Sequence, residues 1–156
     1  MNENDLINLA KILWPINRSI SGEGVRKTLS IVKDYIGELS IYDIPTGSKC
    51  FDWEVPKEWL VRDAYIKDES GKKIISFKEN NLHLVGYSRG INKIITKAEL
   101  EKNLYSLPDQ PDAIPYVTSY YDDSHWGFCI AHNQRVKLDD KKYQVYIDSE
   151  YKHGGI

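Results

Sequence analysis

Two histidines and a cysteine stand close together late in the chain, in the spacing His125-x3-Cys129-x2-His132. Imidazole nitrogen and thiolate sulfur are zinc ligands, and zinc takes convergent side chains in tetrahedral geometry. The aromatic and β-branched residues around them predict a strand, on which positions 125 and 129 share a face and position 132 points the other way. A bulge before His132 would permit a metal site, but the pattern favours Cys129 as a core residue with the histidines near the strand ends.

Paired carboxylates are a second candidate, because two acids facing one substrate can act as general acid and base. Asp122-Asp123 and Asp139-Asp140 are adjacent pairs that flank predicted strands. Neighbouring acids in loops are usually solvated, and nothing sets either pair opposite an acceptor. Nucleophilic catalysis finds no support at Cys129, which is expected to be buried and has no basic neighbour in sequence to lower its pKa. These candidates do not amount to a complete active site, and we assign no catalytic residue and no metal ligand.

Aromatic side chains of the same region offer a different chemistry, since a ring face with a polar tip suits contact with a sugar or a peptide. The rings belong to Tyr116, Tyr120, Tyr121 and Trp126, after the Pro-rich connector LPDQPDAIP. The same residues also serve proteins as core or interface fillers. The substrate-binding residues that we predict are Tyr120, Tyr121, Trp126 and His132.

Composition bounds the class of protein. The 156 residues suffice for one domain with a core, and 41% hydrophobic and 28% charged residues are ordinary for a globular protein. A net charge of −2 without a Lys/Arg cluster gives no reason to expect nucleic acid. Without a signal-peptide pattern or a run of roughly 18 apolar residues, we expect a cytoplasmic protein with no membrane segment. Cys50 and Cys129 both adjoin Phe and are predicted to be buried free thiols.

Apolar residues at helical spacing predict two N-terminal helices, over 4–14 and 22–36. The loop PINRSISGEG joins them; its serines are expected to cap the second helix, and Gly22 and Gly24 permit a close backbone approach. A glycine-bearing loop before a helix can also bind an anion. The spacing and the lysine of a phosphate-binding loop are missing, so capping and packing are the favoured roles.

From residue 39 the apolar period changes from that of a helix to that of a strand. LSIYDIP is predicted as a strand, and FDWEVPKEW as an aromatic connector that seals one edge of the core. The rings expected to do so are Phe51, Trp53 and Trp59. WLVRDAYIKD, KKIISF and NLHLVGYS are predicted as further strands of an antiparallel meander.

A capping box, Thr96-Lys97-Ala98-Glu99, predicts a helix over 97–105 with Leu100 and Leu104 facing inward. After a turn at 133–138, YQVYIDSEY is predicted as a strand with Tyr143, Val145 and Ile147 on one face. The chain is thus expected to be α+β: two N-terminal helices, then a β-rich, mostly antiparallel domain with one short helix. Because the last strand runs into YKHGGI and stops, it resembles a polypeptide cut inside a larger fold.

Several long motifs occur in consecutive order: PINRSISGEGVRKTL, FDWEVPKEWLVRDAYIKD, NLHLVGYS, LPDQPDAIPYVTSYY and WGFCIAH. Together they resemble the N-terminal portion of a bacterial aminopeptidase-like family that is often encoded among polysaccharide-biosynthesis genes and is similar to zinc-dependent exopeptidases. The resemblance implies an α/β zinc-aminopeptidase-like fold with a β-rich domain inserted near its start. On that template, 1–38 is a helical part of the peptidase-like domain, 39–132 the inserted accessory domain, and 133–156 the return into the peptidase-like sheet.

The family's metal ligands lie downstream of the matched segment, in motifs such as His-x-Cys-His-Pro that this chain does not contain. Zinc is therefore implied for a full-length member and not for these residues, and the chain is expected to be inactive alone. The implied substrate of the full-length protein is small and peptide-like or an amino sugar. A stand-alone, non-catalytic module that binds a saccharide or a peptide is the alternative. An incomplete sheet would leave an apolar patch, so we expect an oligomer or a complementing catalytic chain.

Overall fold

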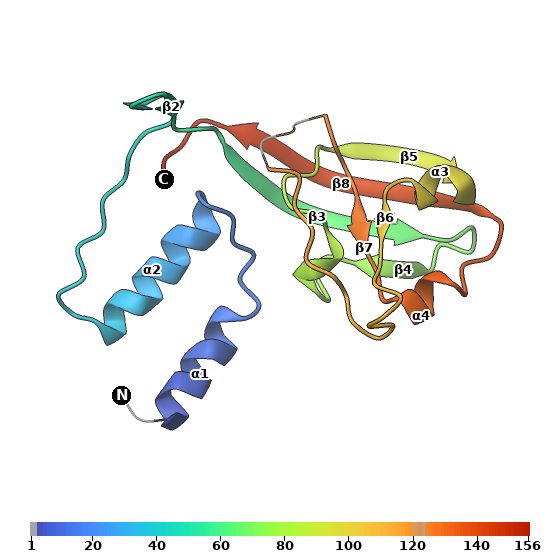
Figure 1. The fold of residues 1–156 in the computed structure, drawn as a ribbon, viewed down its shortest axis with the longest axis horizontal. Helices are drawn as coiled ribbons and strands as arrows, with labels where there is room; N and C mark the ends of the chain where they lie inside the picture. Colours follow the sequence, from blue (N-terminus) through green and yellow to red (C-terminus); the bar gives the residue numbers. More distant parts are fainter. Residues whose placement is uncertain (1–2, 121, 123) are drawn as a thin grey trace. The chain divides into compact units, whose positions relative to one another are not determined.

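The computed structural model describes residues 3–120, 122 and 124–156 (Figure 1). The chain divides into two compact units. Unit 1 comprises residues 1–60 and 151–156, and unit 2 comprises residues 61–150. None of the helices in the described part of the chain is long and apolar enough to cross a membrane.

Unit 1 begins with two amphipathic helices, α1 (Glu3–Leu13) and α2 (Glu23–Tyr35), so both predicted helices are confirmed. Serine capping of α2 is wrong: the N-cap is Gly22, and no side chain caps the helix. The close backbone approach is real, since a Cβ at Gly24 would lie 1.9 Å from the Asn17 carbonyl oxygen. Neither helix buries a single described residue, although both carry an apolar stripe.

The rest of unit 1 departs from the predicted strand over LSIYDIP. Residues 39–44 form no strand of their own, and only Ile44–Thr46 pair with the chain's last residues. A short hairpin of β1 (Lys49–Cys50) and β2 (Trp53–Glu54) follows. The prediction that three aromatic rings cover one edge of the core is wrong for two of them. Phe51, at φ 57°, lies in the turn of the hairpin and is 100% exposed, and Trp53 is exposed as well. Trp59 is buried as expected.

Unit 2 is built on a four-stranded sheet in the order β4-β3-β8-β5. Its strands are β3 (Glu58–Lys67), β4 (Lys73–Ser76), β5 (Ile91–Thr96) and β8 (Lys142–Lys152). The chain passes from one unit to the other within β3 and again within β8. The β3–β4 and β5–β8 pairs are antiparallel, with Tyr65 opposite Ser76 and Ile91 opposite Ile147. The antiparallel character is confirmed. NLHLVGYS, however, supplies a 3-10 turn, η1 (Asn81–His83), and not a strand, and the fourth strand is β5.

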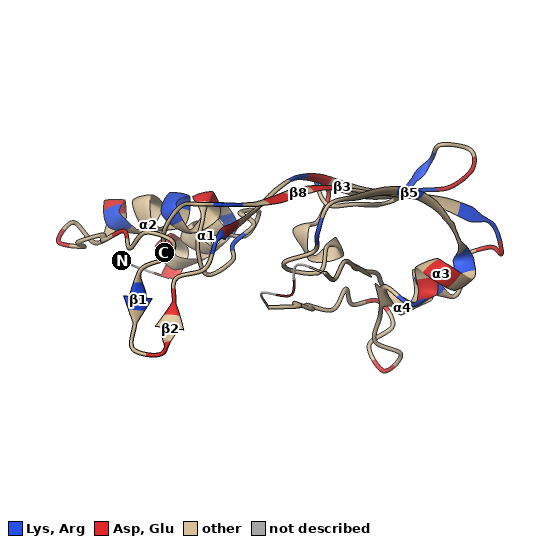
Figure 2. Cartoon of the chain, turned by 90° about the horizontal axis from the view of Figure 1, so that it is seen from above, with Lys and Arg blue, Asp and Glu red and all other residues tan. Residues whose placement is uncertain are grey.

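One face of this sheet carries the core of unit 2. Alternate residues of β3 and β8 are buried on it: Ala64, Ile66, Tyr143, Val145 and Ile147. Figure 2 shows α3 (Lys97–Glu101), α4 (His132–Arg135) and the long loops on one side of the sheet. β6 (Leu104–Tyr105) and β7 (Phe128–Cys129) form a short parallel pair, and β6 contacts α3.

The capping box of α3 is confirmed, with Thr96 accepting from the Glu99 N–H and the Glu99 carboxylate accepting in return. The helix ends at Glu101, earlier than predicted, because Leu104 already belongs to β6; Leu100 and Leu104 are nonetheless both buried. Both cysteines are free. Cys129 is buried as predicted, whereas Cys50 is exposed on the hairpin, so its predicted burial is wrong.

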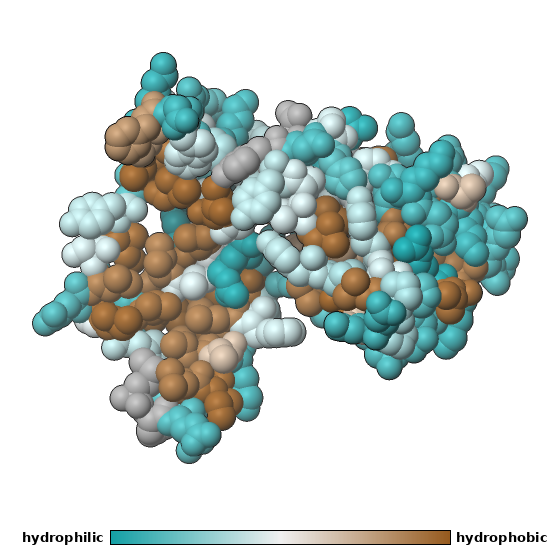
Figure 3. All heavy atoms as spheres, in the orientation of Figure 1, coloured by the Kyte–Doolittle hydropathy of each residue, from teal (hydrophilic) through white to brown (hydrophobic). Residues whose placement is uncertain are grey.

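Apolar residues are concentrated on one part of the surface, whereas charged residues of both signs are interspersed. Figure 2 shows acidic and basic residues interspersed along the strands and helices. Apolar residues gather over the N-terminal helices in Figure 3. The large apolar side chains of unit 1 that remain exposed are Leu6, Ile7, Ile12, Trp14, Tyr35, Ile36, Ile41, Tyr42, Ile44, Phe51 and Trp53. Such a set is unusual for a unit of this size, since large exposed apolar patches mark interaction surfaces.

Candidate functional site

The aromatic segment of unit 2 is held in a loop that contacts Gly86. The Gly86 N–H donates to the Val117 carbonyl oxygen at 2.9 Å, and the Ser119 N–H donates to the Gly86 carbonyl oxygen at 3.0 Å. A Cβ at position 86 would lie 2.9 Å from Thr118 Oγ1, so this approach requires glycine. The loop was predicted as a strand, but it forms only one bridge, between Gly86 and Thr118. Its backbone is therefore fixed at a point between the aromatic side chains.

Two tyrosines of this loop are presented to solvent: Tyr116 is 74% exposed and Tyr120 is 57% exposed. The Tyr120 ring stacks on the buried Tyr87 ring with centroids 5.8 Å apart. Trp126 is half-buried. Tyr121, which was also predicted to bind substrate, lies outside the described residues. The loop thus exposes two tyrosine rings to solvent, and one of them, Tyr120, is held in place by stacking on Tyr87.

The histidines and the cysteine of the 125–132 spacing do not converge on one point. His125 Nε2 lies 3.2 Å from the Tyr105 hydroxyl, while His132 Nδ1 lies 3.0 Å from Ser106 Oγ. Cys129 is fully buried, and burial raises the pKa of its thiol to about 12. In the described part of the chain, no three His, Cys, Asp or Glu side chains are grouped so that they could hold a metal ion. The residues present therefore do not fit a zinc site.

The strand in this region is shorter than the predicted one, so the expected alternation of faces between positions 125 and 132 does not apply. Only Phe128 and Cys129 are in β7; His125 precedes the strand and His132 begins α4. The three side chains are separated because the chain changes direction at both ends of this short strand.

A polar chain around His132 was missed by sequence reasoning. Ser106 Oγ, beside His132, also accepts from Arg135 Nη1 at 3.2 Å, and Arg135 forms an ion pair with the Glu101 carboxylate. Ser106 and His132 are a hydroxyl–imidazole pair of the kind found in nucleophilic catalysis. Here His132 has no carboxylate among its described partners, and the Ser106 hydroxyl oxygen also accepts a hydrogen bond from the Arg135 guanidinium. The arrangement links α4 to α3 and β6, and no local sequence signal joins residues so far apart.

A second nucleophile pattern, also overlooked at the sequence level, is Gly86-Tyr87-Ser88-Arg89-Gly90, which matches Gly-x-Ser-x-Gly. In hydrolases that use this motif, the serine sits exposed on a sharp turn between a strand and a helix. Ser88 is instead fully buried, and its hydroxyl donates to the Val85 carbonyl oxygen at 2.7 Å. The motif leads into β5, not a helix. Ser88 is therefore a structural residue.

The described members of the two carboxylate pairs are solvated or locally bonded. Asp122 accepts from the backbone N–H of Ser124 at 2.9 Å and from its hydroxyl, and these bonds lower the pKa of Asp122. Asp123 lies outside the described residues. Asp139 is paired with Lys141 at 2.8 Å on the surface, and Asp140 is exposed. The described pair, Asp139 and Asp140, does not form an acid–base couple.

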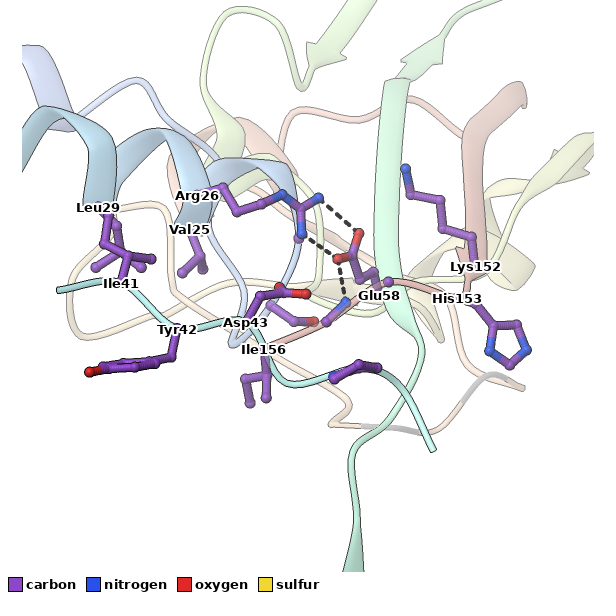
Figure 4. A pocket seen from close by; sticks show the side chains of 15 residues that line it. Val25, Arg26, Leu29, Ile41, Tyr42, Asp43, Glu58, Lys152, His153 and Ile156 are labelled. Atoms are coloured by element: carbon purple, nitrogen blue, oxygen red, sulfur yellow. Dashed lines mark hydrogen bonds and ion pairs between the residues drawn. The ribbon is translucent and has the colours of Figure 1, made fainter. Parts of the chain in front are cut away.

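Unit 1 contains a pocket of about 580 Å³ between α2, residues 41–45 and the last five residues of the chain (Figure 4). One part of its wall is apolar, with Val25, Leu29, Ile41 and Ile156. The other part is charged, with Arg26, Asp43, Glu58, Lys152 and His153. In Figure 4, Leu29 and Ile41 lie together at one end, away from the ion pair formed by Arg26 and Glu58.

That ion pair closes the charged end of the pocket. Arg26 Nη1 lies 2.5 Å from Glu58 Oε1, and Arg26 Nη2 lies 3.1 Å from Oε2. The Gly155 N–H donates to the same carboxylate at 2.9 Å. A Cβ at Gly154 would lie 2.1 Å from Glu58 Oε1, so glycine is needed for this approach.

The Glu58 side chain is only 2% exposed, whereas that of Arg26 is 46% exposed. The bond from Arg26 lowers the pKa of Glu58 most, against the opposing effect of burial. The N–H of Gly155 and the charges of Arg26 and Lys152 lower it further. A carboxylate held ionised by three donors and shielded from water is a poor proton donor. The pair therefore fixes the first turn of α2 to the start of β3 and to the chain's end, and it is not an acid–base group.

Three comparisons with known proteins agree. Residues 58–150 match the family model described as "Domain of unknown function (DUF2172)". A Clostridium acetobutylicum protein, named "Putative polysaccharide biosynthesis protein with aminopeptidase-like domain", is 45% identical over 152 residues. That match takes in 97% of this chain, and the chain spans only 35% of the relative's length.

A crystal structure of a "putative peptidase" from the same organism covers 98% of this chain with a TM-score of 0.93 and 45% identity, and the match takes in 36% of that protein. The predicted α+β class is confirmed, the chain matches about a third of a larger structure, and the resemblance based on the sequence motifs is confirmed as well. The chain therefore belongs to the family of the DUF2172 domain.

Proposed function

We propose that this chain is the N-terminal and accessory part of a zinc-aminopeptidase-like hydrolase associated with polysaccharide biosynthesis, and that it does not hydrolyse substrate alone. One observation carries the proposal: almost the whole chain is 45% identical to a protein with an aminopeptidase-like domain in its name, of which it spans only 35%. The additional polypeptide of such relatives would supply the zinc ligands and the catalytic acid. Zinc, when bound there, would polarise the scissile carbonyl and activate a water molecule.

The contribution of this chain would be to contact the substrate or to shape its route to the metal. Tyr116 and Tyr120 support this role, because both rings are exposed on a loop that is anchored at Gly86. Trp126 and His132, which are half-buried and near in sequence, would complete the contact surface; Tyr121, the remaining predicted residue, lies outside the described residues. A small aminoacylated or amino-sugar substrate fits such a surface, since tyrosine offers both a ring face and a hydroxyl.

Metal content and activity test the division of labour. The purified chain and the intact Clostridium acetobutylicum relative would be dialysed against zinc, analysed for bound metal, and assayed on a panel of aminoacyl p-nitroanilides. We expect zinc and hydrolysis in the relative, and neither stoichiometric zinc nor hydrolysis in this chain. Zinc-dependent turnover by the 156-residue chain alone would refute the proposal.

A stand-alone binding module is the second candidate, and the same exposed tyrosines favour it. Calorimetric titration of the chain with amino sugars and short peptides would test it. Tyr116→Ala should weaken any such binding at least tenfold, because stacking on a ring is lost. Tyr35→Ala is the control, since Tyr35 is an exposed tyrosine on α2 of unit 1 that does not line the pocket. Equal effects of the two substitutions, or no binding at all, would eliminate the module.

A further inference from the structure

The sheet of unit 2 carries a pair of stacked tyrosines on the face opposite to its core. Tyr65 stands between two buried residues of β3, and Tyr146 stands between two buried residues of β8. Because side chains alternate along a strand, both tyrosines point away from the core. Their rings stack with centroids 4.8 Å apart and an angle of 22° between the planes. Helices α3 and α4 lie on the core side in Figure 2, so no described helix of unit 2 covers the tyrosines.

Two lysine side chains converge on one of these rings. The Nζ atom of Lys67 lies 4.7 Å from the centroid of the Tyr65 ring, and that of Lys73 lies 4.6 Å from the same centroid. The two lysines are opposite each other in the β3–β4 pair. An aromatic ring attracts an ammonium group through its quadrupole, but two like charges near one ring repel each other. An anion between the two ammonium groups would relieve this repulsion.

The carboxylates on β3 and β8 within unit 2 do not supply that anion, because other cations hold them. Asp63 is paired with Lys78, and both Asp148 and Glu150 are paired with Arg62. Among the described residues, neither of the two ammonium groups over the ring forms an ion pair. The positive charge at this end of the sheet is therefore available to a ligand.

The acids nearest to the lysines in sequence, Asp68 and Glu69, are engaged elsewhere. The Asp68 carboxylate accepts from the Ser70 N–H at 2.9 Å, from the Ser70 hydroxyl at 2.6 Å and from the Lys72 N–H at 3.0 Å. Asp68 and Glu69 both line a hollow together with Tyr143, whose buried ring belongs to the core face. They therefore do not neutralise the lysines over the tyrosine ring.

Two carboxamides continue the row beyond the tyrosines. Asn92 is opposite Tyr146 in the β5–β8 pair, and Gln144, two positions from Tyr146, donates to Asn92 Oδ1 at 3.4 Å. A carboxamide both donates and accepts, which suits the hydroxyl groups of a sugar. The row crosses all four strands, about 14 Å at the usual strand spacing. We call it the outer band, and it comprises Lys73, Lys67, Tyr65, Tyr146, Gln144 and Asn92.

We propose that the outer band binds an acidic saccharide. Lys67 and Lys73 would hold its carboxylate or phosphate group, and the tyrosine rings and carboxamides would contact its sugar rings and hydroxyls. The face of a sheet has no free backbone groups with which to pair a peptide strand, and a net charge of −2 does not favour nucleic acid. The proposal goes beyond the proposed function, because it requires neither zinc nor the tyrosine loop anchored at Gly86.

Calorimetric titration of the whole chain tests the proposal with two matched ligands, trigalacturonate and its neutral methyl ester. We expect the acid to bind about tenfold more tightly than the ester at low salt, because only the acid offers carboxylates to the lysines. A parallel titration with glucose 6-phosphate shows whether a phosphate serves as well as a carboxylate. Equal binding of the acid and the ester, or no binding of either acidic sugar at millimolar concentration, would overturn the proposal.

Two double variants with the same change in net charge separate a site from general attraction. Lys67→Gln with Lys73→Gln should weaken binding of the acidic sugar about tenfold. Lys93→Gln with Lys102→Gln is the control and should leave the binding unchanged. Lys93 is opposite the buried Val145 and so belongs to the core side of the sheet, and Lys102 is exposed at the end of α3. Equal losses in the two double variants would overturn the proposal.

Substitutions of Tyr65 test whether the ring is part of the site. Tyr65→Phe keeps the ring and should retain the binding, whereas Tyr65→Leu should weaken it about threefold because the ammonium groups lose the ring that positions them. Thermal unfolding of each variant verifies that it is folded. Unchanged binding in Tyr65→Leu would overturn the proposal. Poly-glutamate that binds more tightly than the acidic sugars, and only when Lys67 and Lys73 are present, would identify an acidic peptide as the ligand and overturn it as well.

Discussion

Replacing Arg26 by alanine should destabilise unit 1 more than neutralising its partner does. The substitution leaves the Glu58 carboxylate, 2% exposed, with the Gly155 N–H as its remaining hydrogen-bond donor. Breaking a buried ion pair in this way costs about 3–5 kcal/mol. Because 46% of the Arg26 side chain is exposed, water screens part of the interaction, and we expect a loss of about 2 kcal/mol at pH 7. Glu58→Gln should cost about 1 kcal/mol, since no buried charge remains and Arg26 can turn to solvent.

The effect of Arg26→Ala should depend on pH with a defined sign. The pKa of Glu58 is lowered below its ordinary value of 4.5 in the folded chain, chiefly by the bond from Arg26. The pair therefore stabilises the fold above pH 4.5 and loses this contribution as the pH falls through the lowered pKa. In the variant the largest cause of this lowering is lost while burial still acts, so the pKa of Glu58 rises relative to that in the unsubstituted chain, and protonation on acidification removes the unpaired buried charge. The difference in stability between the two proteins should be largest at pH 7 and should shrink towards pH 4.

Urea unfolding, followed by tryptophan fluorescence, measures this difference. A Trp126→Phe background confines the signal to unit 1, which contains Trp14, Trp53 and Trp59. Unfolding free energies would be compared at pH 7 and pH 4 for Arg26→Ala and Glu58→Gln. The prediction fails if Arg26→Ala lowers the unfolding free energy less than Glu58→Gln does, or if its effect does not change with pH. Either result would mean that the buried Glu58 carboxylate does not depend on Arg26 for its charge.

Three further outcomes follow from local geometry. Gly24→Ala should lower stability by about 2 kcal/mol or more, because its Cβ would meet the Asn17 carbonyl oxygen. Gly37→Ala is the control and should be neutral, since a Cβ there has nothing within 4 Å; thermal unfolding of the two variants measures the difference. One thiol per folded chain should react with a disulfide reagent at pH 8, that of Cys50, and a second only after denaturation, since burial raises the pKa of Cys129 to about 12. Thr96→Ala should cost about 1 kcal/mol by removing the cap of α3, as measured by urea unfolding, and an unchanged midpoint would contradict the capping box.

Local patterns predicted the elements whose residues interact with near neighbours in sequence. Helices α1 and α2 follow from apolar spacing, and the cap of α3 follows from Thr96 and Glu99, three positions apart. Strand β8 and its buried face follow from alternation. The candidate site could be predicted from the sequence only in part. Its exposed tyrosines were predicted, but the partners of His125 and His132 depend on where β6 lies against β7, which no local pattern encodes.

The sequence by itself determined the family, because long motifs persist in order along the whole chain, and it determined the α+β class through apolar periodicity. Only the tertiary structure decided that Ser88 is buried, that the three possible zinc ligands separate, and that Arg26 meets Glu58. These outcomes depend on contacts between residues that are distant in sequence. The path of the backbone at Gly86, at β7 and at Gly154–Gly155 brings those residues together or keeps them apart. The backbone pairing that brings Ile156 beside Ile44 is likewise a feature that only the folded chain reveals.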